Sequence, residues 1–255
     1  LVCMPNTNPI IDNVSIVELL QRKARKESHV KIYSTASITK GLKGSELTEF
    51  GLLSEAGALA FTDATSSVRS SSVMYKALKY ASAFDLLLMQ HPEEKELSEG
   101  GSMTSGQLST ELGIKGIPLE AEVIQVERDI RLAEMTNSKL HFLNVTTGLA
   151  VDAIKVAQDK GLKISCSTSP HYFSLDEKNI KKWRTFAKLS PPLRDMKNVN
   201  FVKDAILKNI ISCITSDHSP HDTDSKRLPF ELALPGSIGF QSLLPLTLNL
   251  VKEKK

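Results

Sequence analysis

The sequence predicts an α/β fold, a (β/α)8 TIM barrel of which strands 2–8 are present. Apolar segments rich in β-branched residues alternate with segments of helical periodicity, which is typical of parallel βαβ units. Each apolar segment ends in a polar cluster, as in barrels, whose active sites lie at the carboxyl ends of the strands. A doubly wound sheet is the alternative, but no GxGxxG or GxxxxGKS/T motif follows any strand.

Seven segments are expected to form strands. In chain order they are LVCMPNT, VKIYSTAS, GALAFTDA, DLLLMQH, KLHFLNVTT, LKISCSTSPH and IISCITSDH. The spacing of apolar residues predicts helices over 15–26, 72–83, 121–135, 149–160 and 199–208, the third with Val123, Val126, Ile130 and Ala133 on one face. The segments 92–118 and 219–237 are expected to be long functional loops. Since a barrel has eight strands, we expect the first strand to lie before residue 1.

Composition excludes several classes of protein. The 255 residues are expected to form a single domain over 1–255, and their net charge of +3 gives no reason to expect nucleic acid or a membrane surface as partner. The cysteines Cys3, Cys166 and Cys213 form no CxxC pair, so we expect a reducing cytoplasm rather than a disulfide framework. No apolar run is long enough to predict a transmembrane helix.

Three residues that could bind a metal ion or transfer protons follow three different expected strands: Asp63, His91 and Asp217. Because the strand ends of a barrel converge on one mouth, we expect these side chains to bind a metal ion. Zinc accepts carboxylate and imidazole ligands together, and it lowers the pKa of bound water to about 7. Taken singly, a strand-terminal Asp more often caps the next helix, and a lone His more often lies in the core or at the rim.

The segment SDHSPH adds His218 and His221 beside Asp217. The Asp217 carboxylate could bind a metal ion with one oxygen and take a proton from attacking water with the other. A polar turn that caps a helix is the alternative. Asn6 in MPNTNP and Arg194 in SPPLRD lie on expected rim loops, where an Arg suits a bidentate contact with a carboxylate. Arg194 could instead pair with an acidic neighbour on the surface.

The remaining His and Cys residues are expected to be structural or solvated. His141 lies within an apolar strand and is expected in the core, whereas His29 follows a charged helix and is expected on the surface. His171 either lines the pocket or packs beneath it. Cys166 and Cys213 lie inside strand patterns and are expected to be buried small hydrophobes.

Seven motifs along the chain occur together in one known family. They are MPNTNPIID, EAGALAFTD, QHPEE, GIPLEAEVIQVERDIRLAEMT, LHFLNVTT, KLSPPLRD and SDHSPHD. In their order and spacing they resemble the dihydroorotases, which are metal-dependent (β/α)8 barrels of the amidohydrolase superfamily. The resemblance covers essentially the whole chain, and it implies a chain truncated at both ends, without the first strand, its HxH ligand pair and a flanking small β-domain.

The resemblance implies an enzyme of pyrimidine biosynthesis that interconverts L-dihydroorotate and N-carbamoyl-L-aspartate. The implied cofactor is Zn²⁺, as one or two ions, and the implied metal ligands are Asp63, His91 and Asp217. Asp217 is also the implied general base. The implied substrate-binding residues are Asn6, Arg194, His221, Pro235 and Gly236, the last two on a loop that closes over the substrate.

The chain departs from the family motifs at several of these strand ends. Asn144 stands where the family has a His ligand, and an amide is a poor zinc ligand, so a second ion is expected to bind weakly. The family's EVTPHH has become STSPHY, the Asn before PPLR is Ser190, and Ala64-Thr65 follow Asp63.

Two other functions are compatible with these departures. The first is a catalytically inactive dihydroorotase-like protein that serves as a structural partner, for example of aspartate transcarbamoylase. The second is an amidohydrolase that acts on another cyclic amide or ureide. A small-molecule substrate is expected for the enzyme, and a homodimer is a further expected assembly.

Overall fold

The computed structural model describes residues 1–253, which group into two compact units. The first unit consists of Leu1–His91, Glu127–Leu143 and Ala157–Ile164. The second unit consists of Pro92–Val126, Asn144–Val156 and the described residues from Ser165 onward. The two units therefore alternate along the chain, and a single domain over 1–255 stays a prediction.

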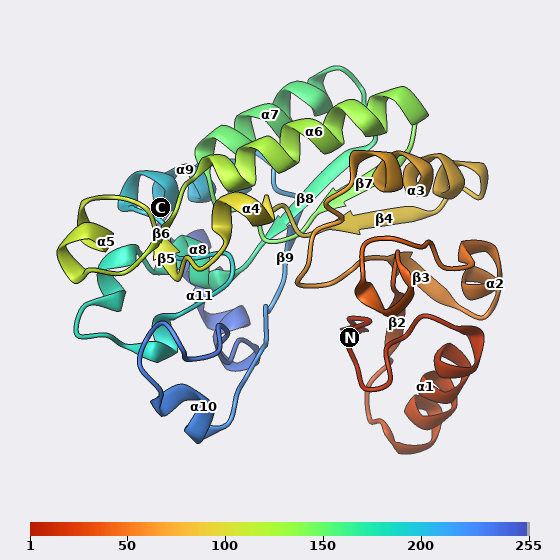
Figure 1. The fold of residues 1–255 in the computed structure, drawn as a ribbon, viewed down its shortest axis with the longest axis horizontal. Helices are drawn as coiled ribbons and strands as arrows, with labels where there is room; N and C mark the ends of the chain where they lie inside the picture. The colour runs from red at the N-terminus through yellow and green to blue at the C-terminus, as the bar shows by residue number, and fades with distance from the viewer. Residues whose placement is uncertain (254–255) are drawn as a thin grey trace. The chain divides into compact units, whose positions relative to one another are not determined.

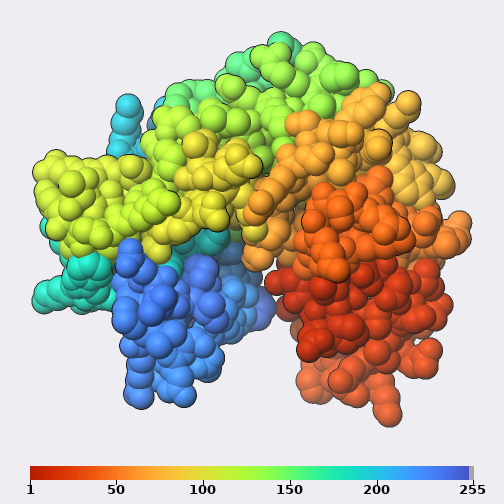
Figure 2. All heavy atoms as spheres, in the orientation of Figure 1, coloured from red at the N-terminus to blue at the C-terminus, as the bar shows by residue number. Residues whose placement is uncertain are grey.

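The first unit is built on parallel strands in the order β1 (Val2–Cys3), β2 (Tyr33–Ala36), β3 (Ala58–Phe61), β4 (Leu87–Gln90) and β7 (Lys139–Phe142) (Figure 1). The most regular pairing joins β4 and β7, with Leu88 opposite Leu140. Both of these residues are fully buried. In the space-filling view the red and orange atoms of residues 1–91 form one continuous body (Figure 2).

The helices of the first unit are α1 (Val14–Glu27), the 3-10 helix η1 (Lys40–Leu42), α2 (Phe50–Glu55) and α3 (Ser71–Ala83). The three α-helices bury apolar side chains, whereas η1 buries none. Asn13 and Ser70 begin α1 and α3 by accepting a hydrogen bond from a backbone N–H of the first turn. The core of this unit includes the Phe50 ring, which stacks on Tyr80 at 4.9 Å.

The second unit contains the pair of parallel strands β8 (Ile164–Thr168, from Ser165 onward) and β9 (Cys213–Ile214). A separate two-stranded sheet joins β5 (Met103–Thr104) and β6 (Gly116–Ile117). The helices are α4 (Lys95–Ser98), α5 (Gln107–Leu112), α8 (Pro170–Ser174), η2 (Glu177–Ile180), η3 (Thr185–Ala187), α9 (Met196–Leu207), α10 (Thr223–Arg227) and α11 (Phe240–Glu253).

Two long helices contribute residues to both units, because the unit boundaries fall within them. They are α6 (Glu120–Thr136) and α7 (Gly148–Asp159). The buried face of α6 differs from the expected apolar stripe: Glu122, Gln125 and Asp129 are as buried as Val126. Carboxylates tolerate such burial when they are paired: Glu122 pairs with Arg194, and Asp129 pairs with Arg128 and accepts from the Gln90 amide.

All seven predicted strands are present, and each of the five predicted helices lies within two or three residues of its expected bounds. The expected loop over 92–118 instead contains two short helices and the β5–β6 sheet, because two-residue strands leave no periodic signal in a sequence. The expected burial of Cys213 is wrong, since its side chain is exposed on β9, the last strand in the order of its sheet. No helix within residues 1–253 combines the length and apolarity needed to cross a membrane.

Candidate active site

Asp217 follows β9 with its carboxylate held by two neutral side chains. The Asn144 amide nitrogen donates to one carboxylate oxygen at 2.8 Å, and the Tyr172 hydroxyl lies 3.3 Å from the other. All three residues belong to the second unit. Two donors directed at different oxygens fix the plane of a carboxylate, which otherwise rotates freely about its terminal bond.

The backbone at Asn144 and at Asp217 is unusual. Their φ angles of 49° and 46° lie in the left-handed region, which residues other than glycine rarely adopt but which Asn and Asp tolerate best. The Thr215 hydroxyl donates to the Asn144 amide oxygen at 3.1 Å, and the Asp217 carboxylate, which can only accept, identifies the end of the amide that faces it as the nitrogen. The amide is therefore held at both of its ends.

Tyr172 reaches this carboxylate from α8, and its side chain is buried. Burial, reinforced by the negative charge of Asp217, holds the pKa of the Tyr172 phenol well above its usual range. The hydroxyl therefore stays protonated and acts as a donor. A second acceptor, the Pro191 carbonyl oxygen, lies 3.1 Å from the same hydroxyl.

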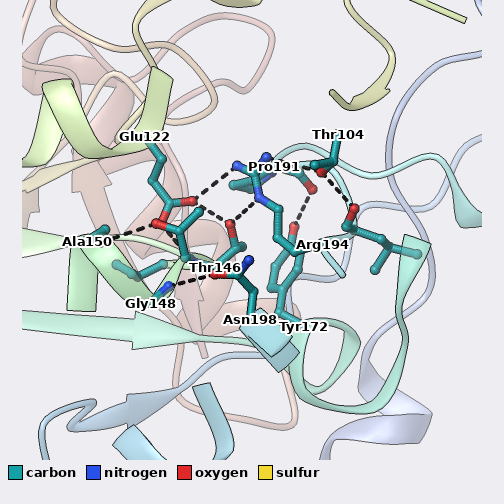
Figure 3. A network of polar contacts seen from close by, with 12 residues as sticks. Thr104, Glu122, Thr146, Gly148, Ala150, Tyr172, Pro191, Arg194 and Asn198 are labelled. Atoms are coloured by element: carbon teal, nitrogen blue, oxygen red, sulfur yellow. Dashed lines mark hydrogen bonds and ion pairs between the residues drawn. The ribbon is translucent and has the colours of Figure 1, made fainter. Parts of the chain in front are cut away.

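A buried ion pair lies in the same unit, between Arg194 and Glu122 (Figure 3). The Arg194 guanidinium is 3.3 Å from the Glu122 carboxylate and donates to the hydroxyls of Thr146 at 2.9 Å and Thr104 at 3.2 Å. Glu122 also accepts bonds at 2.9 Å from the backbone N–H groups of Thr146 and Thr147. Such complete pairing compensates the cost of removing both charges from water.

Arg194 is thus not on an exposed rim loop, since only 4% of its side chain is accessible. The alternative interpretation, a surface pair with an acidic neighbour, is wrong about the surface: Arg194 does pair with an acidic residue, Glu122, but both side chains are buried. Sequence reasoning overlooked Glu122 because a carboxylate within an amphipathic helix normally marks the solvent face.

The predicted substrate loop and the SDHSPH segment are in direct contact. The His221 imidazole donates to the Pro235 carbonyl at 2.9 Å, and the Ser219 N–H donates to the Ser237 carbonyl at 2.9 Å. Gly236 has a φ of 134°, and a Cβ atom there would lie 2.4 Å from the Ser219 carbonyl oxygen. Only glycine fits this position.

Two further imidazoles hold the same loop. His171 donates to the Ile238 carbonyl at 3.2 Å, and His218 accepts from the Gly239 N–H at 3.0 Å while its ring stacks on Phe240. His171 is buried beside this loop, and whether it lines the pocket or packs beneath it stays a prediction. The structure therefore brings together His221, Pro235 and Gly236 of the predicted substrate residues.

The other predicted site residues belong to the first unit. Asp63 is buried, and its carboxylate accepts bonds from the Thr39 N–H at 2.9 Å and the Thr39 hydroxyl at 2.5 Å. Burial raises the pKa of Asp63, and the bonds from Thr39 oppose this rise. His91 is buried directly after β4, whereas Asn6 is exposed after β1.

Metal ligation by these residues can be judged from their donor atoms. Across residues 1–253, the His, Cys, Asp and Glu side chains include no group of three or more arranged to hold a metal ion. The carboxylates of Asp63 and Asp217 instead accept hydrogen bonds through both of their oxygens. The described residues thus supply donor atoms suited to a metal ion, but no complete ligand set.

The expectations for His29 and Cys166 are confirmed, whereas that for His141 is met only in part. His29 is exposed, and His141 is half-buried within β7, where burial lowers its pKa to about 4. Cys166 is fully buried, and burial raises the pKa of its thiol to about 12, which makes it a poor nucleophile.

Tyr172 is the site residue that sequence reasoning missed. The available signal was the change of the EVTPHH motif to STSPHY, in which Tyr172 occupies the last position. Asn144 was noticed as a departure from the family, but its bond to Asp217 was not foreseen because the two residues are 73 positions apart.

Comparison with known proteins supplies the family. Residues 1–148 match the family described as "Dihydro-orotase-like". The chain is 43% identical over 247 residues to "Dihydroorotase" of Acetivibrio thermocellus and 43% identical over 251 residues to "Dihydroorotase" of Geobacter sulfurreducens. These matches cover 97% and 98% of the chain but 58% and 59% of the relatives, so the chain spans little more than half of their length.

Solved structures share the fold at lower sequence identity. An L-hydantoinase (dihydropyrimidinase) from Arthrobacter aurescens matches with a TM-score of 0.84 and 19% identity, over 99% of the chain and 58% of that protein. A dihydroorotase from Saccharomyces cerevisiae in complex with 5-fluoroorotic acid matches with a TM-score of 0.78 and 15% identity, over 99% of the chain and 70% of that protein. The predicted α/β barrel fold is confirmed by these matches, and the chain belongs to the dihydroorotase-like family.

Proposed function

We propose that the full-length protein is a dihydroorotase-type cyclic amidohydrolase, which interconverts L-dihydroorotate and N-carbamoyl-L-aspartate in pyrimidine biosynthesis. Relatives named dihydroorotase that are 43% identical to the chain support this function. The observation that carries it is the strand-end carboxylate of Asp217, which is held at both oxygens by Asn144 and Tyr172.

The chemistry needs one group that accepts a proton and then returns it. In the hydrolytic direction, the oxygen of water adds to the ring carbonyl carbon, the ring C–N bond breaks, and the leaving nitrogen gains a proton. Asp217 takes the proton from the attacking water and delivers it to this nitrogen. A carboxylate whose plane is already fixed needs little reorganisation before either transfer.

Metal ligation is proposed for Asp63 and His91 of the first unit and for Asp217 of the second. Their carboxylate and imidazole groups suit Zn²⁺, and a bound zinc ion would polarise the substrate carbonyl. Since the described residues form no complete ligand set, the proton transfers above are assigned to Asp217 alone.

For substrate binding, we propose that His221, Pro235 and Gly236 frame the substrate, and that Asn6 and Arg194 contribute polar contacts. The hydrogen bond from His221 to Pro235 supports a preformed wall, because it fixes one segment against the other. Arg194 reaches Glu122, Thr146 and Thr104 in the structure, so any contact with a substrate carboxylate would compete with these bonds.

The test is a dihydroorotate hydrolysis assay combined with metal analysis of the full-length protein. We expect bound zinc and measurable turnover, and we expect Asp217→Asn to lower kcat by roughly a thousandfold, since it removes the proton acceptor. Removal of the metal by a chelator is expected to abolish turnover, and added zinc is expected to restore it.

Asp222→Asn is the matched control for Asp217→Asn. Asp222 is an exposed residue that begins α10 by accepting from the Ser225 N–H, and Asn serves equally well in this position. Equal activity of the two variants would contradict the role of Asp217. A metal-free protein without turnover would favour a catalytically inactive structural partner, and hydrolysis of a cyclic ureide alone would favour a related amidohydrolase.

A further inference from the structure

The two side chains that hold the Asp217 carboxylate stand at positions where the chain departs from the dihydroorotase motifs. Asn144 replaces a His after one strand, and Tyr172 ends the altered STSPHY segment. The structure shows that both replacements contact the same carboxylate, each through a neutral donor.

Neighbouring residues fix the orientation of the Asn144 amide that contacts Asp217. Its backbone N–H lies 3.4 Å from the Ser167 hydroxyl, and its amide oxygen accepts from Thr215, so the amide nitrogen has one direction in which to donate. The left-handed backbone of Asn144 directs the side chain toward Asp217 at some conformational cost. A strained backbone conformation of this kind is retained where the surrounding structure holds the residue in it.

The contact from Tyr172 has a different character. The hydroxyl carries one proton, and two acceptors lie near it, the Pro191 carbonyl at 3.1 Å and the Asp217 carboxylate at 3.3 Å. A charged acceptor attracts the proton more strongly than a neutral one. The proton can therefore turn toward Asp217 when the carboxylate is charged, without movement of the tyrosine ring.

We infer that Asn144 and Tyr172 are positioning residues for Asp217, which fix the plane of its carboxylate. The inference rests on the proposed function, because positioning has a catalytic meaning only if Asp217 transfers protons. Neither residue contacts the substrate in this assignment. Their loss should therefore reduce kcat and leave KM nearly unchanged.

The kinetic test uses Asn144→Ala and Asn144→His in the full-length protein. A hydrogen bond to a charged group contributes enough for Asn144→Ala to lower kcat about tenfold or more, with KM within about twofold. His keeps a donor and tolerates the left-handed backbone, so Asn144→His should retain kcat within about fivefold. Asn137→Ala is the matched control, since Asn137 has a φ of 50° and is exposed.

The test for Tyr172 is the substitution Tyr172→Phe, which removes only the hydroxyl. We expect a fall in kcat of about tenfold, with KM within about twofold. Tyr33→Phe is the control, because Tyr33 is exposed in the first unit. A rise in KM without a fall in kcat, for either residue, would show contact with the substrate and would overturn the assignment.

A second measurement does not depend on activity. If Asn144 acts through Asp217, then Asn144→Ala should lower the urea midpoint of the wild-type protein more than Asn137→Ala does. In an Asp217→Ala background the effect of Asn144→Ala should be smaller than in the wild type, because the acceptor is gone and only the bond from Thr215 is left to lose. The same effect of Asn144→Ala in both backgrounds would overturn the inference. A protein with coupled midpoints but no dihydroorotate turnover would instead contradict the proposed function alone.

Discussion

Arg194 and Glu122 show how a charged pair is stabilised inside the second unit. Each charge has several partners: the guanidinium donates to two threonine hydroxyls, and the carboxylate accepts from two backbone N–H groups. Because both side chains are almost fully buried, neither charge can be stabilised by water if the other is removed. The pair is therefore sensitive to single substitutions.

We expect Glu122→Ala to lower the free energy of unfolding by about 3–5 kcal/mol, since it leaves the Arg194 charge buried without its counter-charge. Urea denaturation measures the loss. Asp85→Asn is the control, because it removes the charge of the exposed pair with Lys139, keeps a residue that tolerates the φ of 55° at this position, and should change stability little. If both substitutions had the same small effect, the Arg194–Glu122 pair would not be as buried as the structure shows.

At the scale of elements, the first unit is held together by aromatic packing between a strand and two helices. Phe50 of α2 lies 4.5 Å from the Phe61 ring of β3 and 4.9 Å from the Tyr80 ring of α3, measured between ring centroids. Phe50 and Phe61 are fully buried. Aromatic pairs add to the stabilisation from burial of their area.

Phe50→Ala is expected to destabilise the protein by about 3–5 kcal/mol, because it removes a large buried ring and leaves a cavity. Thermal or urea unfolding measures this loss. Phe186→Ala is the matched control, since 67% of Phe186 is exposed and its removal leaves no cavity. A loss below about 1 kcal/mol for Phe50→Ala would mean that the neighbouring rings collapse into the space.

At the scale of the whole molecule, the first unit depends on segments that are far apart in the sequence. Its strand β4 ends just before His91, and the partner strand β7 begins at Lys139. Four residue pairs join these two strands. A fragment of residues 1–91 would therefore expose the buried edge of β4 together with Leu88.

We expect a 1–91 fragment to aggregate or to give a poorly dispersed amide spectrum, whereas a 1–164 fragment, which contains every segment of the first unit, should give dispersed signals. Proton–nitrogen correlation spectra of the two fragments provide the comparison. Well-dispersed signals from 1–91 would show that β7 is dispensable for this part of the fold.

The sequence predicted elements better than it predicted contacts. Strands such as Leu87–Gln90 have an apolar pattern that is local, so their existence could be inferred without knowledge of the fold. The strands β5 and β6 could not be inferred in this way, because a strand of two residues shows no periodicity in the sequence. At the site, Asp217, His221 and Gly236 were identified from motifs, whereas Tyr172 was missed because its contact with Asp217 arises only in the folded chain.

Buried carboxylates are the other feature that the sequence did not predict. Glu122 and Asp129 appear in the sequence as the polar side of an amphipathic helix, yet both are buried in the structure. Their partners, Arg194 for Glu122 and Gln90 for Asp129, are 72 and 39 positions away. No helical periodicity contains this information, because it depends on which distant residue arrives beside the helix.

The alternation of the two units along the chain also limits how such a gene can recombine. Three segments of one unit alternate with three of the other, and the boundaries at 126–127 and 156–157 fall inside the helices α6 and α7. A crossover between homologous genes anywhere from residue 92 to residue 164 would join pieces of both units from different parents. Chimaeras with breakpoints in this interval should thus be recovered less often than those with breakpoints in 1–91.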